Sequence, residues 1–205
     1  MATDPAGAVE RLVINIEGQL VAFGPYRRDH IPVYQAWIND FDFGTTRTLK
    51  IPPGPMTAEQ ETAWYDAMSR SSTTTSFVIY ERSSGRPVGG TNLHDIDYRH
   101  RTASFGIMIG APDYQGKGYG TEATRLMLDY AFTALGLHSV MLTVYAFNLA
   151  GQRAYAKAGF KEIGRRRECR WMGGRLWDEI YVDCLATEFV SPILDRVFVP
   201  DEPRS

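Results

Sequence analysis

Residues 112–122, with the sequence PDYQGKGYGTE, constrain the fold more than any other segment, because three glycines and a lysine stand directly before an amphipathic run. Glycine lets the backbone approach a ligand closely, and the N–H groups at the start of a helix attract anions. Apolar residues then recur at helical spacing. On the opposite face of this helix we expect the polar residues Glu122, Arg125, Asp129 and Thr133. The segment predicts a loop and a helix that together bind a phosphate group.

Two common phosphate-binding motifs do not fit this loop. A P-loop needs a hydroxyl residue after its lysine to hold magnesium, but Gly118 follows Lys117. The dinucleotide-binding motif G-x-G-x-x-G is one residue longer than the run Gly116-x-Gly118-x-Gly120. The remaining pattern, Gln115-x-x-Gly118-x-Gly120, still favours an anion. A glycine-rich turn with nothing bound stays as the alternative.

Length and composition are typical of one globular domain. The 205 residues are 44% hydrophobic and 22% charged, and the formal charge of −2 predicts no general attraction to nucleic acid or to a membrane. The N-terminus lacks the basic start and the long apolar stretch of an export signal. Two cysteines, Cys169 and Cys184, are too few for a disulfide framework, and the histidines are too scattered to suggest a metal site. We therefore expect a cytoplasmic protein without a metal site, with one domain at 1–190 and a C-terminal tail at 191–205.

The order of elements predicts a mixed α/β sheet that is mostly antiparallel. Turn signals and alternating apolar residues place strands at 12–16, 20–23, 77–80, 87–98, 103–109, 140–144, 162–172 and 176–185. Helices are expected from Asp29 and Pro32, from the capping box at 57–60 to about Arg70, from the glycine-rich loop to Gly136, and from Asn148 to Gly159. Residues 51–55, IPPGP, must form a loop. The run RRRECR at 165–170 is typical of a solvated edge strand.

Several of these segments together resemble a known family. The loop QGKGYGTEA, a strand ending at Asn148, a tyrosine at 155 and KAGF at 157–160 resemble the GNAT family of acyl-CoA-dependent N-acetyltransferases. The segments GGTNLHDIDYRHRTASFGIMI and DEIYVDCL resemble the branch that contains the ribosomal-protein alanine acetyltransferases. The resemblance covers residues 20–188. It implies a GNAT fold, in which the central sheet is splayed at an acyl-CoA slot and flanked by helices.

The resemblance also implies a site for acetyl-CoA as co-substrate. The loop would hold the pyrophosphate through backbone N–H groups, and the preceding strand would pair with the pantetheine arm. The next strand, which begins near Ser139, would splay away to leave room for that arm. The coenzyme-binding residues implied are Ile107, Met108, Ile109, Gln115, Gly116, Lys117, Gly118, Tyr119, Gly120, Thr121, Asn148 and Lys157.

For catalysis, the resemblance points to Tyr155 and Asn148. A phenol near the thioester can protonate the thiolate that leaves when an amine attacks. Asn148 can both cap a helix and contact the pantetheine arm. Many relatives carry a glutamate base on the strand before the loop, where this chain has Ser104. The neighbouring residues His94, Asp95 and Asp97 are the reserve candidates for the base.

The acceptor is less constrained. A primary amine is expected to attack directly, without an acyl-enzyme, and it could belong to a protein N-terminus, an amino sugar, a polyamine or a natural product. Acidic residues that permit a small amine are Asp40, Asp42, Asp95 and Asp97, and aromatic residues expected along one wall are Trp37, Phe41, Phe43 and Trp64. A non-catalytic acyl-CoA-binding module is the alternative function. The apolar hairpin WMGGRLWDEIYV and the resemblance predict a homodimer.

Overall fold

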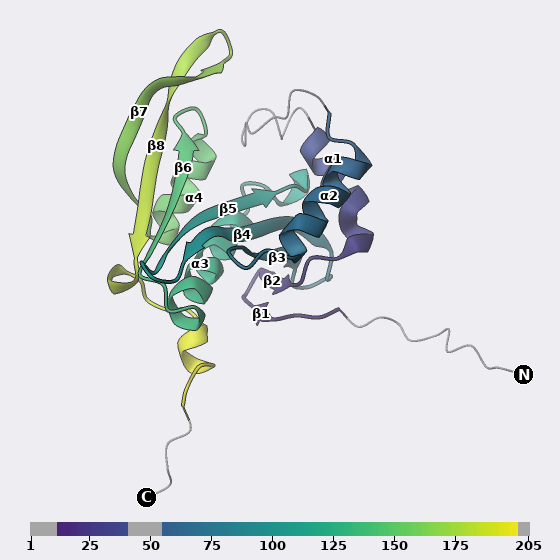
Figure 1. The fold of residues 1–205 in the computed structure, drawn as a ribbon, viewed down its shortest axis with the longest axis vertical. Helices are drawn as coiled ribbons and strands as arrows, with labels where there is room; N and C mark the ends of the chain where they lie inside the picture. The colour runs from purple at the N-terminus through teal and green to yellow at the C-terminus, as the bar shows by residue number, and fades with distance from the viewer. Residues whose placement is uncertain (1–11, 41–54, 201–205) are drawn as a thin grey trace, which may run out of the picture.

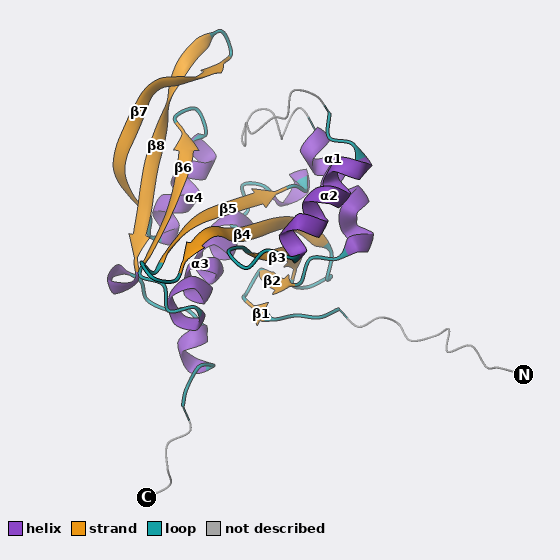
Figure 2. Ribbon diagram, viewed as in Figure 1, coloured by secondary structure: helices purple, strands orange, loops and turns teal. Residues whose placement is uncertain are grey.

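A computed structural model describes residues 12–40 and 55–200 of the chain. The strands are β1 (Ile16–Glu17), β2 (Val21–Gly24), β3 (Thr75–Glu81), β4 (Pro87–Asp97), β5 (Thr102–Ile109), β6 (Ser139–Tyr145), β7 (Lys161–Met172) and β8 (Arg175–Leu185). The α-helices are α1 (Ile31–Asn39), α2 (Ala58–Ser69), α3 (Tyr119–Asp129) and α4 (Leu149–Ala158). Figure 2 distinguishes the helices from the strands by colour.

The strands form one sheet in the order β1-β2-β3-β4-β5-β6-β8-β7, and only β5 and β6 pair in parallel. Each of the first five strands pairs with its neighbour in the sequence, whereas β8 lies between β6 and β7. The predicted mixed, mostly antiparallel sheet is therefore confirmed. In Figure 1 the β7–β8 hairpin projects well beyond the rest of the sheet, on the side away from α1 and α2.

Both faces of the sheet are covered by helices. On β3, Phe77 and Ile79 belong to the main core, which includes buried residues of α3, whereas Val78 and Tyr80 pack with Tyr34 of α1. This division follows from the strand period of two, which sends alternate side chains to opposite faces. The helices α1 and α2 thus lie over one face, and α3 lies against the other.

Local signals determine where the helices begin and end. The Thr57 hydroxyl accepts the Gln60 N–H, and the Gln60 side chain accepts the Thr57 N–H, which completes the predicted capping box of α2. Asn148 caps α4 by accepting the Gly151 N–H at 2.9 Å. Gly159 ends that helix with a φ of 117°, in the left-handed region that favours glycine.

The helix after the loop differs from the expectation in two respects. Its α-helical part ends at Asp129, and Tyr130–Ala134 form a turn of π-helix. Asp129, expected on the polar face, is fully buried, because its carboxylate accepts the backbone N–H groups of Ile193 and Leu194. Leu194 is buried as well, so the first residues of the predicted tail pack on the domain.

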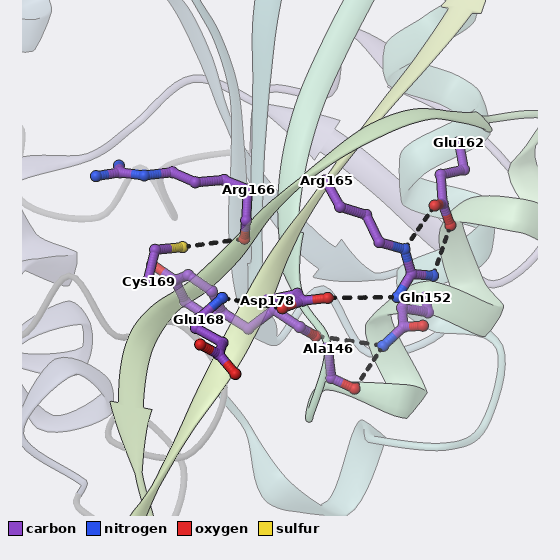
Figure 3. Close-up of polar contacts among 9 residues, drawn as sticks. Ala146, Gln152, Glu162, Arg165, Arg166, Glu168, Cys169 and Asp178 are labelled. Carbon is purple, nitrogen blue, oxygen red and sulfur yellow. Dashed lines mark hydrogen bonds and ion pairs between the residues drawn. The ribbon is translucent and has the colours of Figure 1, made fainter.

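The strand β7 is an edge strand, as predicted, but its side chains do not alternate as expected. The pairing with β8 shifts between Arg166 and Arg170, and Glu168 has a φ of 49°. Figure 3 shows how this bulge is held: the Glu168 N–H donates to Asp178, and the Cys169 thiol donates to the Arg166 carbonyl. A bulge at an edge hinders pairing with another chain at that point.

Candidate active site

The sheet opens between β5 and β6. These strands pair only from Thr102 to Ser104, opposite 139–141, although β5 continues to Ile109 and β6 to Tyr145. Figure 1 shows the two strands running apart from their common start. Along 107–109, the backbone groups that face β6 therefore lack a strand partner. An extended ligand can pair with them as a strand would.

The glycine-rich loop lies at the open end of this slot. Gly116 and Gly118 have φ angles of 72° and 93°, which non-glycine residues adopt at a cost. Gly118 is the N-cap of α3, and no side chain caps that end. The first N–H groups of the helix are thus available to an anion. The Lys117 side chain is exposed beside them, and the Gln115 amide donates to the Ile109 carbonyl at 3.3 Å, tying loop to strand.

Two tyrosines, Tyr114 and Tyr119, hold the glycine-rich loop against the end of β3. The Tyr114 and Tyr119 hydroxyls both donate to the Glu81 carboxylate, at 2.9 and 3.3 Å, and the two rings meet edge to face. Hydrogen bonds from Ser84 and from these tyrosines lower the pKa of Glu81, so it stays ionised. Because the Tyr119 ring is engaged there, Tyr119 can offer a coenzyme its backbone more readily than its side chain.

Glu122, in the first turn of α3, anchors the loop to the start of the chain. Its carboxylate accepts the N–H groups of Gln19, Leu20 and Val21 at 2.6, 2.7 and 3.0 Å. These bonds compensate the negative charge of Glu122, which would otherwise repel a phosphate bound to the loop. The turn between β1 and β2 therefore supports the loop, a connection that sequence patterns did not predict.

Tyr155 lies on α4, with its ring against the closed end of the slot. The ring packs against Phe105 of β5 and Phe160, with centroid distances of 6.3 and 6.0 Å. Burial raises the pKa of Tyr155 to about 12. The phenol is therefore protonated at neutral pH, which is the state needed to donate a proton to a leaving thiolate.

The connection from β6 to α4 fixes Asn148 beside the slot. The Gln152 amide donates to the carbonyls of Tyr145 and Ala146, at 3.2 and 3.0 Å, and Figure 3 shows the bond to Ala146. This clamp holds the segment that leads into the α4 N-terminus. Lys157 is exposed in the last turn of the same helix.

The candidate bases lie in different surroundings. His94 is directly opposite Ser104 on the neighbouring strand, so the structure brings these two together. Asp95 has a φ of 51° in a bulge of β4, and its side chain is 85% exposed. Asp97 accepts the His100 N–H and so belongs to the turn between β4 and β5. Of the three, His94 lies opposite Ser104, where the pairing of β5 and β6 ends and the slot begins, whereas Asp97 lies opposite Thr102.

Two of the aromatic residues expected beside the acceptor, Trp37 and Trp64, lie on the first two helices. The Trp37 ring covers Gly110, where an added Cβ would lie 2.2 Å from it, and Trp64 is 40% exposed on α2. Phe41, Asp42 and Phe43 lie outside the described residues. Sequence patterns missed Tyr26 and Glu61, although Glu61 stands one helical turn before Trp64 and faces the same way.

Comparison with known proteins identifies the family. Residues 21–161 match the acetyltransferase (GNAT) domain. The chain belongs to this family. A spermidine N(1)-acetyltransferase of Vibrio cholerae is 37% identical over 100 residues, which are 49% of this chain and 57% of that enzyme. The human alpha/beta-tubulin-N-acetyltransferase 9 is 28% identical over 158 residues, 71% of this chain and 74% of that protein.

The GNAT fold is confirmed by a solved structure. The spermidine N-acetyltransferase from Vibrio cholerae in complex with CoA and spermine superimposes with a TM-score of 0.74 and 25% identity, covering 82% of this chain and 97% of that one. The narrower resemblance to the ribosomal-protein alanine acetyltransferases stays a prediction. Within 12–40 and 55–200, the chain has no helix that is both long and apolar enough to cross a membrane.

Proposed function

We propose that the protein transfers the acetyl group of acetyl-CoA to a primary amine. The observation that carries this proposal is the parting of β5 and β6 beside an uncapped, glycine-rich helix start. The parted strands offer unpaired backbone groups to an extended arm. The start of α3 offers N–H groups to a pyrophosphate. Their adjacency suits coenzyme A, which carries both chemical parts.

In this proposal each predicted residue has a defined role. The backbone of 115–121 binds the pyrophosphate, with Lys117 adding charge, and Ile107, Met108 and Ile109 pair with the pantetheine arm. Asn148 contacts the arm from the other side, and Lys157 lies near its outer end. These assignments follow the positions that the residues hold on β5, the loop and α4.

The reaction proceeds by direct attack. The neutral amine nitrogen forms a bond to the thioester carbonyl carbon, and the carbon–sulfur bond then breaks. The departing thiolate takes the proton of the Tyr155 phenol, while the nitrogen loses its extra proton to a base. His94, across from Ser104, is the candidate to accept that proton through water. The acceptor is a small amine, among which a polyamine is the class named for the Vibrio relative, or a protein N-terminus.

The variant Tyr155→Phe tests the proposal. Turnover should fall strongly while the affinity for acetyl-CoA stays nearly unchanged, because the phenol acts on the leaving group and not on ground-state binding. Tyr98→Phe, at a site 57% exposed, is the control. Equal turnover of parent and Tyr155→Phe would remove Tyr155 from the chemistry. Binding of acetyl-CoA without transfer to any amine would favour the acyl-CoA-binding module.

We also propose that the protein forms a homodimer in the cytoplasm. Three large apolar side chains are exposed on the projecting β7–β8 hairpin: Ile163 is 57% exposed, Trp171 68% and Leu176 50%. Trp171 and Leu176 are cross-strand neighbours, and such an exposed apolar pair favours association with a second copy. Sedimentation should give the dimer mass for the parent protein and the monomer mass for Trp171→Lys. A monomeric parent at micromolar concentration would refute the dimer.

A further inference from the structure

The helix α2 has a single fully buried residue, and that residue is a glutamate. Glu61 is 4% exposed, whereas Glu59 on the same helix is exposed to solvent. Burying a carboxylate is costly unless it is paired. Burial accordingly raises the pKa of Glu61. An energetically unfavourable group at the acceptor side of the sheet calls for an explanation beyond packing.

No basic side chain of the described residues compensates this carboxylate. The nearby arginines are engaged elsewhere: Arg27 pairs with Asp29 at 2.7 Å, and Arg28 pairs with Asp66. None of the remaining ion pairs in the described part of the chain includes Glu61. A cation that completes the site would therefore have to come from outside the described residues.

The surroundings of Glu61 suit an ammonium group. The Tyr26 and Trp64 rings meet edge to face, with centroids 5.6 Å apart, and Tyr26 also contacts Tyr34 at 5.1 Å. Glu61 stands three residues before Trp64 on α2, on the same side of the helix, and its negative charge adds to burial in raising the pKa of Tyr26. Aromatic faces next to a carboxylate bind cations more strongly than either group alone. Trp64 is 40% exposed and leaves this cluster open to solvent.

The cluster lies beside the slot. The Tyr26 hydroxyl covers Gly90 of β4, where an added Cβ would lie 2.0 Å from it, and Gly90 pairs with Met108 of β5. Met108 is three residues from Phe105, against which the Tyr155 ring packs. At about 3.3 Å per residue, these two points on β5 are roughly 10 Å apart. The cluster thus stands about one strand away from the slot, and about 10 Å along it from the expected point of attack.

We propose that Glu61, with Tyr26 and Trp64, binds a second ammonium group of the acceptor, at least roughly 10 Å from the nitrogen that is acetylated. The acceptor is then a linear amine with at least two positive charges, and Glu61 is a specificity-determining residue. This inference rests on the proposed acetyl transfer. Phe105 and Met108 point to opposite faces of β5, so the offset along the strand is the lower limit of the separation. It favours a chain of about seven or more methylene groups between the two nitrogens over a short diamine, since each extended bond advances about 1.25 Å.

The experiment compares linear diamines of seven or more carbons, each with the monoamine of the same length, as acceptors at saturating acetyl-CoA. The parent protein should prefer the diamine in kcat/KM by about ten- to hundredfold, the range expected for a hydrogen bond to a charged group. Glu61→Gln should lose that preference, and Glu59→Gln, which removes the same charge from an exposed position of α2, should keep it. Glu61→Gln should unfold at the same temperature as the parent or higher, because it removes a buried charge.

Calorimetry separates this inference from the proposed function. The diamine is titrated into the protein with coenzyme A bound, a measurement that needs no turnover. Binding that weakens at least tenfold in Glu61→Gln and not in Glu59→Gln supports the role of Glu61 even if no amine is acetylated. Equal binding to all three proteins, or equal transfer to diamine and monoamine by the parent, overturns it while leaving acetyl transfer itself intact.

Discussion

The loop that we assign to the pyrophosphate can be tested with two glycines that differ only in location. Gly116 lies in the loop with a φ of 72°, and Gly136 follows the π-helical turn with a φ of 64°. An added Cβ would meet no atom within 4 Å at either position. Replacing each by alanine therefore introduces the same backbone strain, about 1–2 kcal/mol for a left-handed residue, without a steric clash.

In Gly136→Ala, at a position away from the coenzyme loop, the strain should appear as lost stability. For a protein of this size, 1–2 kcal/mol corresponds to a fall in Tm of about 2–8 °C. In Gly116→Ala the free loop can relax to a negative φ, and the binding of acetyl-CoA must then restore the strained form. The affinity should fall about five- to thirtyfold, which is the same 1–2 kcal/mol expressed as a binding constant.

Differential scanning fluorimetry measures Tm, and calorimetric titration with acetyl-CoA measures affinity. Gly136→Ala, whose residue lies at the far end of the helix from the loop, should lose stability but keep the parent affinity. If Gly116→Ala binds acetyl-CoA as tightly as Gly136→Ala does, the backbone at Gly116 does not contribute to the coenzyme site. The assignment of the pyrophosphate to this loop would then be wrong.

Three further outcomes follow from contacts elsewhere. Asp129→Ala leaves two buried N–H groups without an acceptor, at a loss of about 2 kcal/mol, and should lower Tm by about 4–8 °C. The control Arg125→Ala, on the exposed side of α3, should leave Tm unchanged. Arg170→Met should lower the free energy of unfolding in urea by about 2 kcal/mol, because it leaves Glu179, whose side chain is 6% exposed, without its cation. The control Arg165→Met, beside the exposed Glu162, should change the free energy of unfolding little. Because burial raises the pKa of Tyr155 to about 12, kcat should not fall as pH rises through the ordinary tyrosine value of about 10. A loss of turnover there that is absent from Tyr155→Phe would contradict a phenol that stays protonated.

Much of the fold could be predicted because its signals are local. The capping box at Thr57 and Gln60, the ends of α4 at Asn148 and Gly159, and the hairpin at Gly173 and Gly174 each depend on a few neighbouring residues. These signals act through backbone geometry that the residue types themselves impose. The strand order could be approached in the same way wherever consecutive strands form hairpins.

Contacts between distant segments could not be predicted in this way. Asp129 has the spacing of a surface residue, and only the return of the chain at Leu194 makes it a buried cap. Glu122 likewise acquires its role from the turn at 19–21, about a hundred residues earlier. Glu61 lies between polar neighbours on a helix of low apolar content, so its burial depends on how α2 is placed against the sheet. The slot arises where the backbones of β5 and β6 stop pairing, and the residue types along these strands do not reveal that point.

The position of β8 between β6 and β7 has a consequence for biosynthesis. Residues 179–185 hold β6 along its whole length, so the far wall of the slot is secured by β8, the last strand of the described residues to be made. At about 5–20 residues per second, a ribosome needs roughly 3–12 s to pass from the glycine-rich loop to β8. During that interval the nascent chain carries a finished loop next to an unsupported strand, and its exposed edge is a target for chaperones. The coenzyme can stabilise this fold only once β8 has been made and has paired with β6.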